Sequence, residues 1–334
     1  MSDVPGAGRP CVLVTGGAGY IGSHACEALA RAGYEPVVYD NLSFGHREMV
    51  RFGPLEEGDI RDRARLVEVM QSRRPTAVMH FAALISVGES VQDPALYYDN
   101  NVGGALTLLD AMRECRIGRL VFSSTAAVYG LPEEQPITEA ARHAPINPYG
   151  RTKLMIEQAL SDFSAAYGLR SVALRYFNAC GAHPSGEIGE MHEPETHLIP
   201  RALMAALGQI EALDVMGTDY PTPDGTAVRD YIHVCDLAEA HVAALKRLEA
   251  GGETRALNLG TGRGYSVKEI IEAAERAAGR PVPVRYAPRR PGDPPVLIAD
   301  PGQARAALGW DAKWTDIDAI IASAWTWAQK MAGG

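Results

Sequence analysis

Two side chains capable of proton chemistry, Tyr149 and Lys153, stand four positions apart in residues 147–153 (NPYGRTK). On a helix, this spacing places the phenol and the ammonium group on one face. A neighbouring ammonium group stabilises a phenolate, lowers the tyrosine pKa towards neutrality and allows the oxygen to act as a general base. Tyrosine and lysine also meet at this spacing by chance, so the interpretation depends on the residues that accompany the pair.

Hydroxyl groups precede this pair in residues 123–130 (SSTAAVYG), at the end of a predicted strand. A hydroxyl there can hydrogen-bond an alcohol or ketone of a substrate, although strand-end hydroxyls also simply cap a sheet. In a parallel sheet, the carboxyl ends of the strands lie at one edge, where ligands bind. We therefore expect Thr125 to lie near Tyr149 and Lys153.

Three glycines, Gly16, Gly19 and Gly22, follow the first short β-branched run, in residues 16–22 (GGAGYIG). Glycines at these positions let a tight turn pass under a pyrophosphate and let the next helix pack closely on the strand. A glycine triplet alone is weak evidence, but this one opens the first helix of a predicted unit of strand, helix and strand. The pattern predicts a dinucleotide-binding site.

Carboxylates follow the next two predicted strands. Asp40 lies eighteen residues after Gly22, where a carboxylate binds the ribose hydroxyls of adenosine and repels a 2′-phosphate, which favours NAD over NADP. Alternatively, Asp40 and Asn41 only cap a turn. Asp59 can present its carboxylate to adenine, or it can be the N-cap of the following helix.

The elements that must position these residues alternate along the chain. Short β-branched runs and longer amphipathic segments follow one another, as in a parallel sheet covered by helices. The runs predict strands at residues 11–15, 36–39, 77–81, 119–123, 172–175 and 256–259. The amphipathic segments predict helices at residues 21–32, 62–72, 95–115, 149–167 and 235–248. The fold class is therefore α/β with a doubly wound parallel sheet, and the loop-rich sequence from about residue 181 predicts a smaller, discontinuous second domain.

Composition and charge exclude several classes of protein. The 334 residues suggest about two domains, and 46% hydrophobic with 22% charged residues is ordinary for a globular chain. A net charge of -9 disfavours nucleic acid as a partner, because phosphate binding needs a basic surface. Because there is neither a long apolar run nor a signal-peptide pattern, we expect a cytoplasmic protein with no membrane contact.

Neither the cysteines nor the histidines indicate a metal site. The five cysteines are scattered without a CxxC pair, so we expect reduced thiols and neither disulfides nor a zinc knuckle. His192 and His197 stand five residues apart with Pro194 between them, whereas a helix-borne zinc site needs histidines four residues apart. The sequence therefore predicts no metal.

Taken together, the motifs resemble those of a known family. The sequence resembles the extended short-chain dehydrogenase/reductase superfamily and, within it, closely the UDP-glucose 4-epimerases, over about residues 12–327. The matching stretches include VTGGAGYIGSH (14–24), YDNLS (39–43), YYDNNV (97–102), NPYGRTKLMIE (147–157), RYFNACGAHPSG (175–186) and APRRPGD (287–293).

The resemblance implies an architecture and a reaction. A Rossmann NAD-binding domain would span residues 10–182 plus about 228–262, and a smaller α/β substrate domain would span residues 183–227 plus 263–330. Tightly held NAD would oxidise carbon 4 of a UDP-hexose to a 4-keto intermediate, and the hydride would return to the opposite face. The family also implies a homodimer that pairs through the helices at 95–115 and 149–167.

Roles for individual residues follow from the same resemblance. Tyr149 would be the base, Thr125 would bind the sugar 4-hydroxyl, and Lys153 would support the phenolate and the nicotinamide ribose. Besides Tyr149 and Lys153, NAD would contact Gly16, Gly19, Tyr20, Ile21, Gly22, Asp40, Asn41, Leu42, Asp59, Ile60, Phe81, Ala82, Ala83, Asn100, Ser123 and Phe177. Besides Thr125 and Tyr149, the UDP-sugar would contact Asn178, His197, Leu198, Met216, Arg229, Arg290, Asp293 and Leu297.

Several positions depart from patterns known in the superfamily. Thr125 replaces a serine common among the relatives, which keeps the hydroxyl and restricts its rotamer, so activity should survive. Ile85 and His197 stand where some relatives carry a lysine and an asparagine, so their roles stay open. Ala126 and Ala127 stand where nucleotide-sugar 4,6-dehydratases carry Asp and Glu. Methyl groups cannot transfer protons, so the 4-keto intermediate can only be reduced again.

Alternatives remain for the substrate and for the function. A 4-epimerase for UDP-xylose and UDP-arabinose would use the same residues. A non-catalytic dinucleotide-sensing module is disfavoured, because such proteins lose the tyrosine and lysine that this chain keeps. Leu297 stands where a tyrosine in the family excludes the N-acetyl group of UDP-GlcNAc, so leucine predicts some turnover of UDP-GlcNAc unless it is simply a core residue of a short strand.

Overall fold

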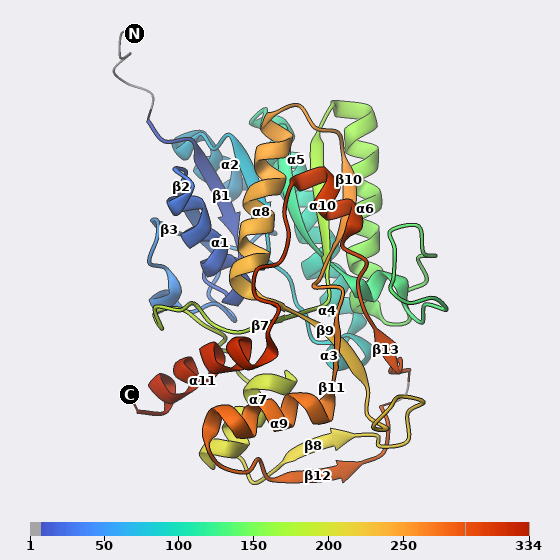
Figure 1. Cartoon of the computed structure of the whole chain (residues 1–334). Coiled ribbons are helices and arrows are strands. Elements are labelled where there is room, and N and C mark those ends of the chain that lie inside the picture. The colour runs from blue at the N-terminus through green and yellow to red at the C-terminus, as the bar shows by residue number, and fades with distance from the viewer. Residues whose placement is uncertain (1–7, 291, 334) are drawn as a thin grey trace.

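A seven-stranded parallel sheet forms the centre of the larger part of the molecule (Figure 1). The structure is a computed structural model, and it describes residues 8–290 and 292–333. The strands are β1 (Cys11–Thr15), β2 (Glu35–Asp40), β3 (Leu55–Glu57), β4 (Ala77–His80), β5 (Arg119–Thr125), β6 (Arg170–Tyr176) and β10 (Arg255–Leu259). Their order is β10-β6-β5-β4-β1-β2-β3, and all neighbours are parallel. The order therefore reverses between β1 and β4, and ligands bind at such a reversal in open parallel sheets.

Helices cover both faces of this sheet because side chains alternate along each strand between two apolar cores. Val12 and Val14 of β1 belong to one core, and Leu13 belongs to the other. The first core is completed by α1 (Tyr20–Arg31), α8 (Val234–Glu249) and α10 (Gly302–Leu308). The second is completed by α2 (Arg63–Arg73), α5 (Gly104–Glu114) and α6 (Pro148–Tyr167). The doubly wound α/β class predicted from the sequence is confirmed.

One predicted helix differs in detail. The sequence predicts a single helix over residues 95–115, whereas the structure has α4 (Pro94–Tyr97), a π-helical segment (Tyr98–Gly103) and α5. The segment contains Asn101, whose side chain is fully buried against the loop after β4. Such π-helical segments occur frequently at functional sites, and this one lies beside α6, which carries Tyr149 and Lys153.

A second, smaller group of elements lies below the large sheet in Figure 1. In it, β9 (Val228–His233) pairs with β7 (Asn178–Cys180), β11 (Gly264–Ser266) and β13 (Val296–Leu297), while β8 (Leu213–Met216) pairs with β12 (Val284–Ala287). A third apolar core joins α7 (Leu198–Leu207), α9 (Val267–Ala278) and α11 (Ile317–Gly333). Both β7 and β9 fall within the ranges 10–182 and 228–262 that the sequence assigned to the NAD-binding domain, yet they pair outside its sheet. The domain boundaries stay a prediction.

The short elements of the fold are α3 (Val87–Gln92) and the 3₁₀ turns Arg47–Met49 and Ala126–Tyr129. Within the described ranges, every helix is too short or too polar to cross a membrane. All five cysteines lie in those ranges as free thiols, and Cys26 and Cys180 are buried.

Candidate active site

The glycine turn after β1 is held by contacts that leave no room for side chains. Gly16 has a φ of +74°, and a Cβ there would lie 2.5 Å from the Ala82 nitrogen. A Cβ on Gly22 would lie 2.1 Å from the Gly16 oxygen, so α1 could not pack as closely on the turn. The helix begins after Gly19 without a side-chain cap, which leaves its first backbone N–H groups available to an anion.

Asp40 ties the end of β2 to this turn. Its buried carboxylate accepts hydrogen bonds from the backbone nitrogens of Ala18, at 3.0 Å, and Leu42, at 2.9 Å. Burial raises the pKa of Asp40, and the two backbone N–H groups oppose that rise. The bond to Leu42 is the turn cap considered above, and the bond to Ala18 additionally places the carboxylate beside the glycine turn. Asp40 therefore lies at the predicted adenosine end of the dinucleotide site.

Asp59 does not cap the helix that follows it. Asp62 is the N-cap of α2, with its side chain accepting from the Arg65 nitrogen at 3.0 Å. Asp59 instead pairs with Arg61, which lowers the Asp59 pKa, and accepts from the Asn41 amide at 3.0 Å. The N-cap alternative is wrong, and Asp59 lies beside Asn41 near the end of β2.

A buried asparagine fixes the loop that follows β4. The Asn101 amide accepts from the Leu84 nitrogen at 2.8 Å, and it donates to the Leu84 oxygen at 3.0 Å and to the Thr152 hydroxyl at 3.2 Å. The predicted cofactor residue Asn100 donates to Asn101 at 3.0 Å. This clamp joins the loop of Phe81, Ala82 and Ala83 to α6. Sequence reasoning missed Asn101, although the YYDNNV motif contained both asparagines.

Helix α6 brings Tyr149 and Lys153 to the end of β5. Asn147 caps the helix by accepting from the Gly150 nitrogen at 2.8 Å. A Cβ on Gly150 would lie 2.7 Å from the Ala127 oxygen, so the helix start packs directly on the turn after Thr125. The Lys153 ammonium is buried, donates to the backbone oxygen of Ser123 at 2.8 Å and lies 5.9 Å from the centre of the Tyr149 ring. The structure thus brings the tyrosine, the lysine and the strand-end hydroxyl together.

The ionisation of this pair differs from the sequence expectation. Burial raises the pKa of Tyr149 to about 12, and a hydrogen bond with the Thr125 hydroxyl opposes the rise. Burial lowers the pKa of Lys153 to about 7, and the charge of Glu157 opposes the fall. In the protein alone, Lys153 therefore does not bring the Tyr149 phenol to a neutral pKa. The positions of the two groups match the prediction, whereas burial raises the pKa of Tyr149 instead of lowering it.

Sequence reasoning missed several polar groups behind the site. The Tyr176 hydroxyl pairs with the Ser123 hydroxyl. Ser124 donates to Glu157 at 2.5 Å, and Glu157 forms a buried ion pair with Arg175 at 2.5 Å. Tyr176 and Arg175 lie within the quoted RYFN motif, but nothing in the local sequence indicated that they contact β5 and α6.

Several of the predicted substrate residues lie in the second sheet. Arg229 on β9 forms an ion pair with Asp293 at 2.5 Å. The Asn178 amide on β7 donates to the backbone oxygen of Asp230 at 3.0 Å. Leu297 on β13 pairs in register with Arg229.

The structure shows which residues surround Leu297. It is half-buried and packs with Phe177 against the cluster that contains Ala126, the residue after Thr125. Leu297 is therefore part of a short strand that packs beside the turn after Thr125, and its role toward the sugar stays a prediction.

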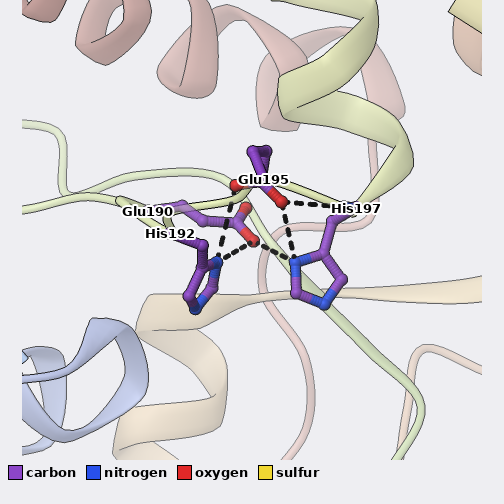
Figure 2. Close-up of side chains that lie close together, drawn as sticks. All are labelled: Glu190, His192, Glu195 and His197. Atoms are coloured by element: carbon purple, nitrogen blue, oxygen red, sulfur yellow. Dashed lines mark hydrogen bonds and ion pairs between the residues drawn. The ribbon is translucent and has the colours of Figure 1, made fainter. Parts of the chain in front are cut away.

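Other predicted residues lie at the edges of the second group of elements. Met216 ends β8, Leu198 begins α7, and the exposed Arg290 lies in the loop before β13. His197 precedes α7, and its Nδ1 faces Glu190 at 2.8 Å (Figure 2). The roles of all these residues toward cofactor and substrate stay predictions.

Comparisons with known proteins agree with this geometry. Residues 12–260 match the model of the NAD dependent epimerase/dehydratase family. The UDP-glucose 4-epimerase of Rhizobium meliloti (strain 1021) is 59% identical over 97% of this chain and 98% of its own length. The enzyme of that name from Rhizobium leguminosarum bv. trifolii is 59% identical over 96% and 97%, respectively. The crystal structure of UDP-glucose 4-epimerase from Brucella ovis in complex with NAD is 57% identical, with a TM-score of 0.93 over 95% of this chain and 99% of that one.

Proposed function

The chain belongs to the NAD dependent epimerase/dehydratase family, and on that premise we propose that it inverts carbon 4 of a UDP-hexose, interconverting UDP-glucose and UDP-galactose. The observation that carries this proposal is the convergence of Tyr149, Lys153 and Thr125 at the end of β5. Both Rhizobium enzymes, each 59% identical to this chain, are named for that activity.

The residues at the sheet edge fit NAD. The turn at Gly16 and Gly22 excludes side chains, the start of α1 offers uncapped N–H groups, and the Asp40 carboxylate lies beside the turn. These features suit a pyrophosphate and an adenosine ribose without a 2′-phosphate. When bound, NAD⁺ supplies a carbon that accepts a hydride and gives it back, together with the positive charge of the oxidised ring.

The chain itself handles the proton and holds the sugar. Tyr149 accepts the proton of the 4-hydroxyl and returns it after the hydride transfer, because it is the only phenol among the three converging side chains. Thr125 orients that hydroxyl, and its hydrogen bond with Tyr149 favours the phenolate. Lys153, held by its hydrogen bond to the backbone oxygen of Ser123, supplies a positive charge that favours the phenolate further. Arg229 and Arg290 are the cations that we assign to the diphosphate.

The turn after Thr125 favours epimerisation over dehydration. Ala126 and Ala127 occupy this turn, and neither can donate or accept a proton. Elimination of water from the 4-keto sugar needs an acid for the leaving hydroxyl and a base for the proton at carbon 5. Without them, the sugar must turn within the site and be reduced on its other face.

A homodimer is part of the proposal. Large apolar side chains are exposed on the elements that the sequence predicts for pairing: Leu96, Leu106, Met155 and Tyr167. Helices α4 and α5 both pack against α6, so these elements form one connected region. We expect light scattering at micromolar concentration to give the mass of two chains, and the mass of one chain would contradict the proposal. The cytoplasmic location stays a prediction.

The decisive experiment is incubation of the purified protein with UDP-galactose and no added cofactor, followed by separation of the sugar nucleotides. We expect UDP-glucose to form, and acid extraction of the same protein to release NAD in proportion to the chain. A protein that is free of NAD as purified, or that forms no UDP-glucose, would contradict the proposal. A parallel incubation with UDP-arabinose tests the pentose alternative, which would be supported by the faster turnover of that substrate.

A further inference from the structure

Four side chains with metal-ligating atoms converge in the loop before α7: Glu190, His192, Glu195 and His197 (Figure 2). One ligand atom of each lies within 4.8 Å of those of the other three. Both histidines turn Nδ1 inward, and each nitrogen faces oxygens of both glutamates. Each nitrogen therefore lies between the two carboxylates.

The nitrogen–oxygen distances in this cluster are those of neighbouring ligands around one metal ion. Ligands at the usual Zn–N and Zn–O lengths are separated from one another by roughly 3.3 Å in a tetrahedron. His197 Nδ1 lies 2.8 Å from Glu190 and 3.2 Å from Glu195. His192 Nδ1 lies 3.3 Å from Glu190 and 3.5 Å from Glu195. All four nitrogen–oxygen distances lie within about half an ångström of that value, with Glu195 turning a different carboxylate oxygen to each histidine.

Pairwise hydrogen bonding leaves one of these nitrogens unsatisfied. The His192 Nδ1 atom is buried but has no hydrogen-bond partner of ordinary geometry, although two carboxylates lie near it. A buried polar atom without a partner is costly. A metal ion at the centre would satisfy this nitrogen and the carboxylate oxygens at once, and its two positive charges would balance the two glutamates.

Contacts from α11 and from the adjacent backbone hold this loop in place. The Trp327 indole of α11 donates to the backbone oxygen of Glu190 at 2.8 Å, and a Cβ on Gly189 would lie 2.5 Å from the Trp327 ring. Glu195 accepts from the backbone nitrogens of Thr196 and His197, both at 2.7 Å. Outer contacts of this kind orient the ligands in protein metal sites.

We propose that Glu190, His192, Glu195 and His197 bind one divalent transition-metal ion, with two imidazole and two carboxylate ligands as suits Zn²⁺. The spacing argument from the sequence excludes only a helix-borne site. The ligands here lie in a loop, so their separation along the chain does not limit their separation in space. The ion joins this loop to the start of α7, and so it fixes the position of Leu198.

The full-length protein, freed of metal with a chelator and then of the chelator, tests the site directly. We expect calorimetric titration with Zn²⁺ to show one ion per chain, and Co²⁺ to give the strong visible absorption of a tetrahedral complex. His192→Gln and Glu190→Gln should each weaken Zn²⁺ binding more than about tenfold, since even outer contacts contribute that much to affinity.

His183→Gln is the matched control, because His183 lies in the same loop but pairs with the Ser185 hydroxyl at 2.8 Å. It should bind Zn²⁺ as the unaltered protein does. Thermal unfolding in chelator confirms that each variant is folded, and Glu190→Gln carries the test if His192→Gln does not fold. Binding that His183→Gln weakens as much as the ligand variants, or the absence of stoichiometric binding, would overturn the proposal.

Discussion

The buried ion pair behind the active site gives the most direct test of how the structure is stabilised. Glu157 and Arg175 are only 9% and 4% exposed, and their charged atoms lie 2.5 Å apart. In Glu157→Gln, the amide keeps the volume of the side chain but leaves the Arg175 guanidinium without a countercharge. Breaking such a pair from one side costs about 3–5 kcal/mol, because a charge remains buried and unpaired. That is a large part of the roughly 5–15 kcal/mol by which proteins are stable.

Urea unfolding of the NAD-saturated protein, followed by circular dichroism, measures this loss. The matched control is Asp318→Asn, which breaks an ion pair with Arg276 that is more than half exposed, and it should cost under about 1 kcal/mol. Glu157→Leu combined with Arg175→Met should be less destabilising than Glu157→Gln alone, because no charge is then left buried. If Glu157→Gln costs no more than the surface control, the reasoning is refuted.

The same substitution should also change the pH dependence of the reaction. The charge of Glu157 raises the pKa of Lys153 against the effect of burial. Without that charge the Lys153 pKa falls further, so less of the ammonium form is present at neutral pH. The part of the pH profile that follows Lys153 should therefore move to lower pH in Glu157→Gln, and a shift to higher pH would contradict this account.

Three further predictions concern the base, the sugar pocket and acid stability. Tyr149→Phe should lower turnover of UDP-galactose by about a hundredfold or more while NAD content is unchanged, and Thr125→Ser should keep nearly the original rate. A Tyr149→Phe rate within about tenfold of the original would show that Tyr149 is not the general base. The unaltered protein should turn over UDP-GlcNAc more slowly than UDP-glucose, and Leu297→Tyr should abolish the first activity and spare the second, because the larger ring fills space that glucose leaves free; equal losses in a two-substrate assay would show that Leu297 is not the gate. Burial lowers the pKa of His80 to about 3 and of His241 to about 4. Below about pH 6.5 these histidines are therefore protonated in the unfolded chain but neutral in the folded chain, so the free energy of unfolding should fall by up to ~1.4 kcal/mol per pH unit for each histidine. A urea midpoint at pH 5 equal to or above that at pH 7 would contradict this.

Local sequence patterns determined the large sheet and the core of the candidate active site. The alternation of strands and helices predicted the doubly wound sheet, because the side-chain periods of the two elements differ and each must bury one face. The glycine turn and the spacing of Tyr149 and Lys153 are likewise short-range features. Their geometry follows from one turn or one helix, so residues close in the sequence were sufficient to identify them.

Only the tertiary structure decided the groups that depend on distant segments. Asn101 reaches Leu84 and Thr152, and Tyr176 reaches Ser123, through contacts between separate elements. The glutamate and histidine cluster lies in a loop, where no repeating period relates sequence separation to distance. The pKa shifts of Tyr149 and Lys153 are also set by burial, which only the packed structure establishes. Local pattern therefore sets which residues share an element, whereas packing sets which elements meet and how far their charges are removed from water.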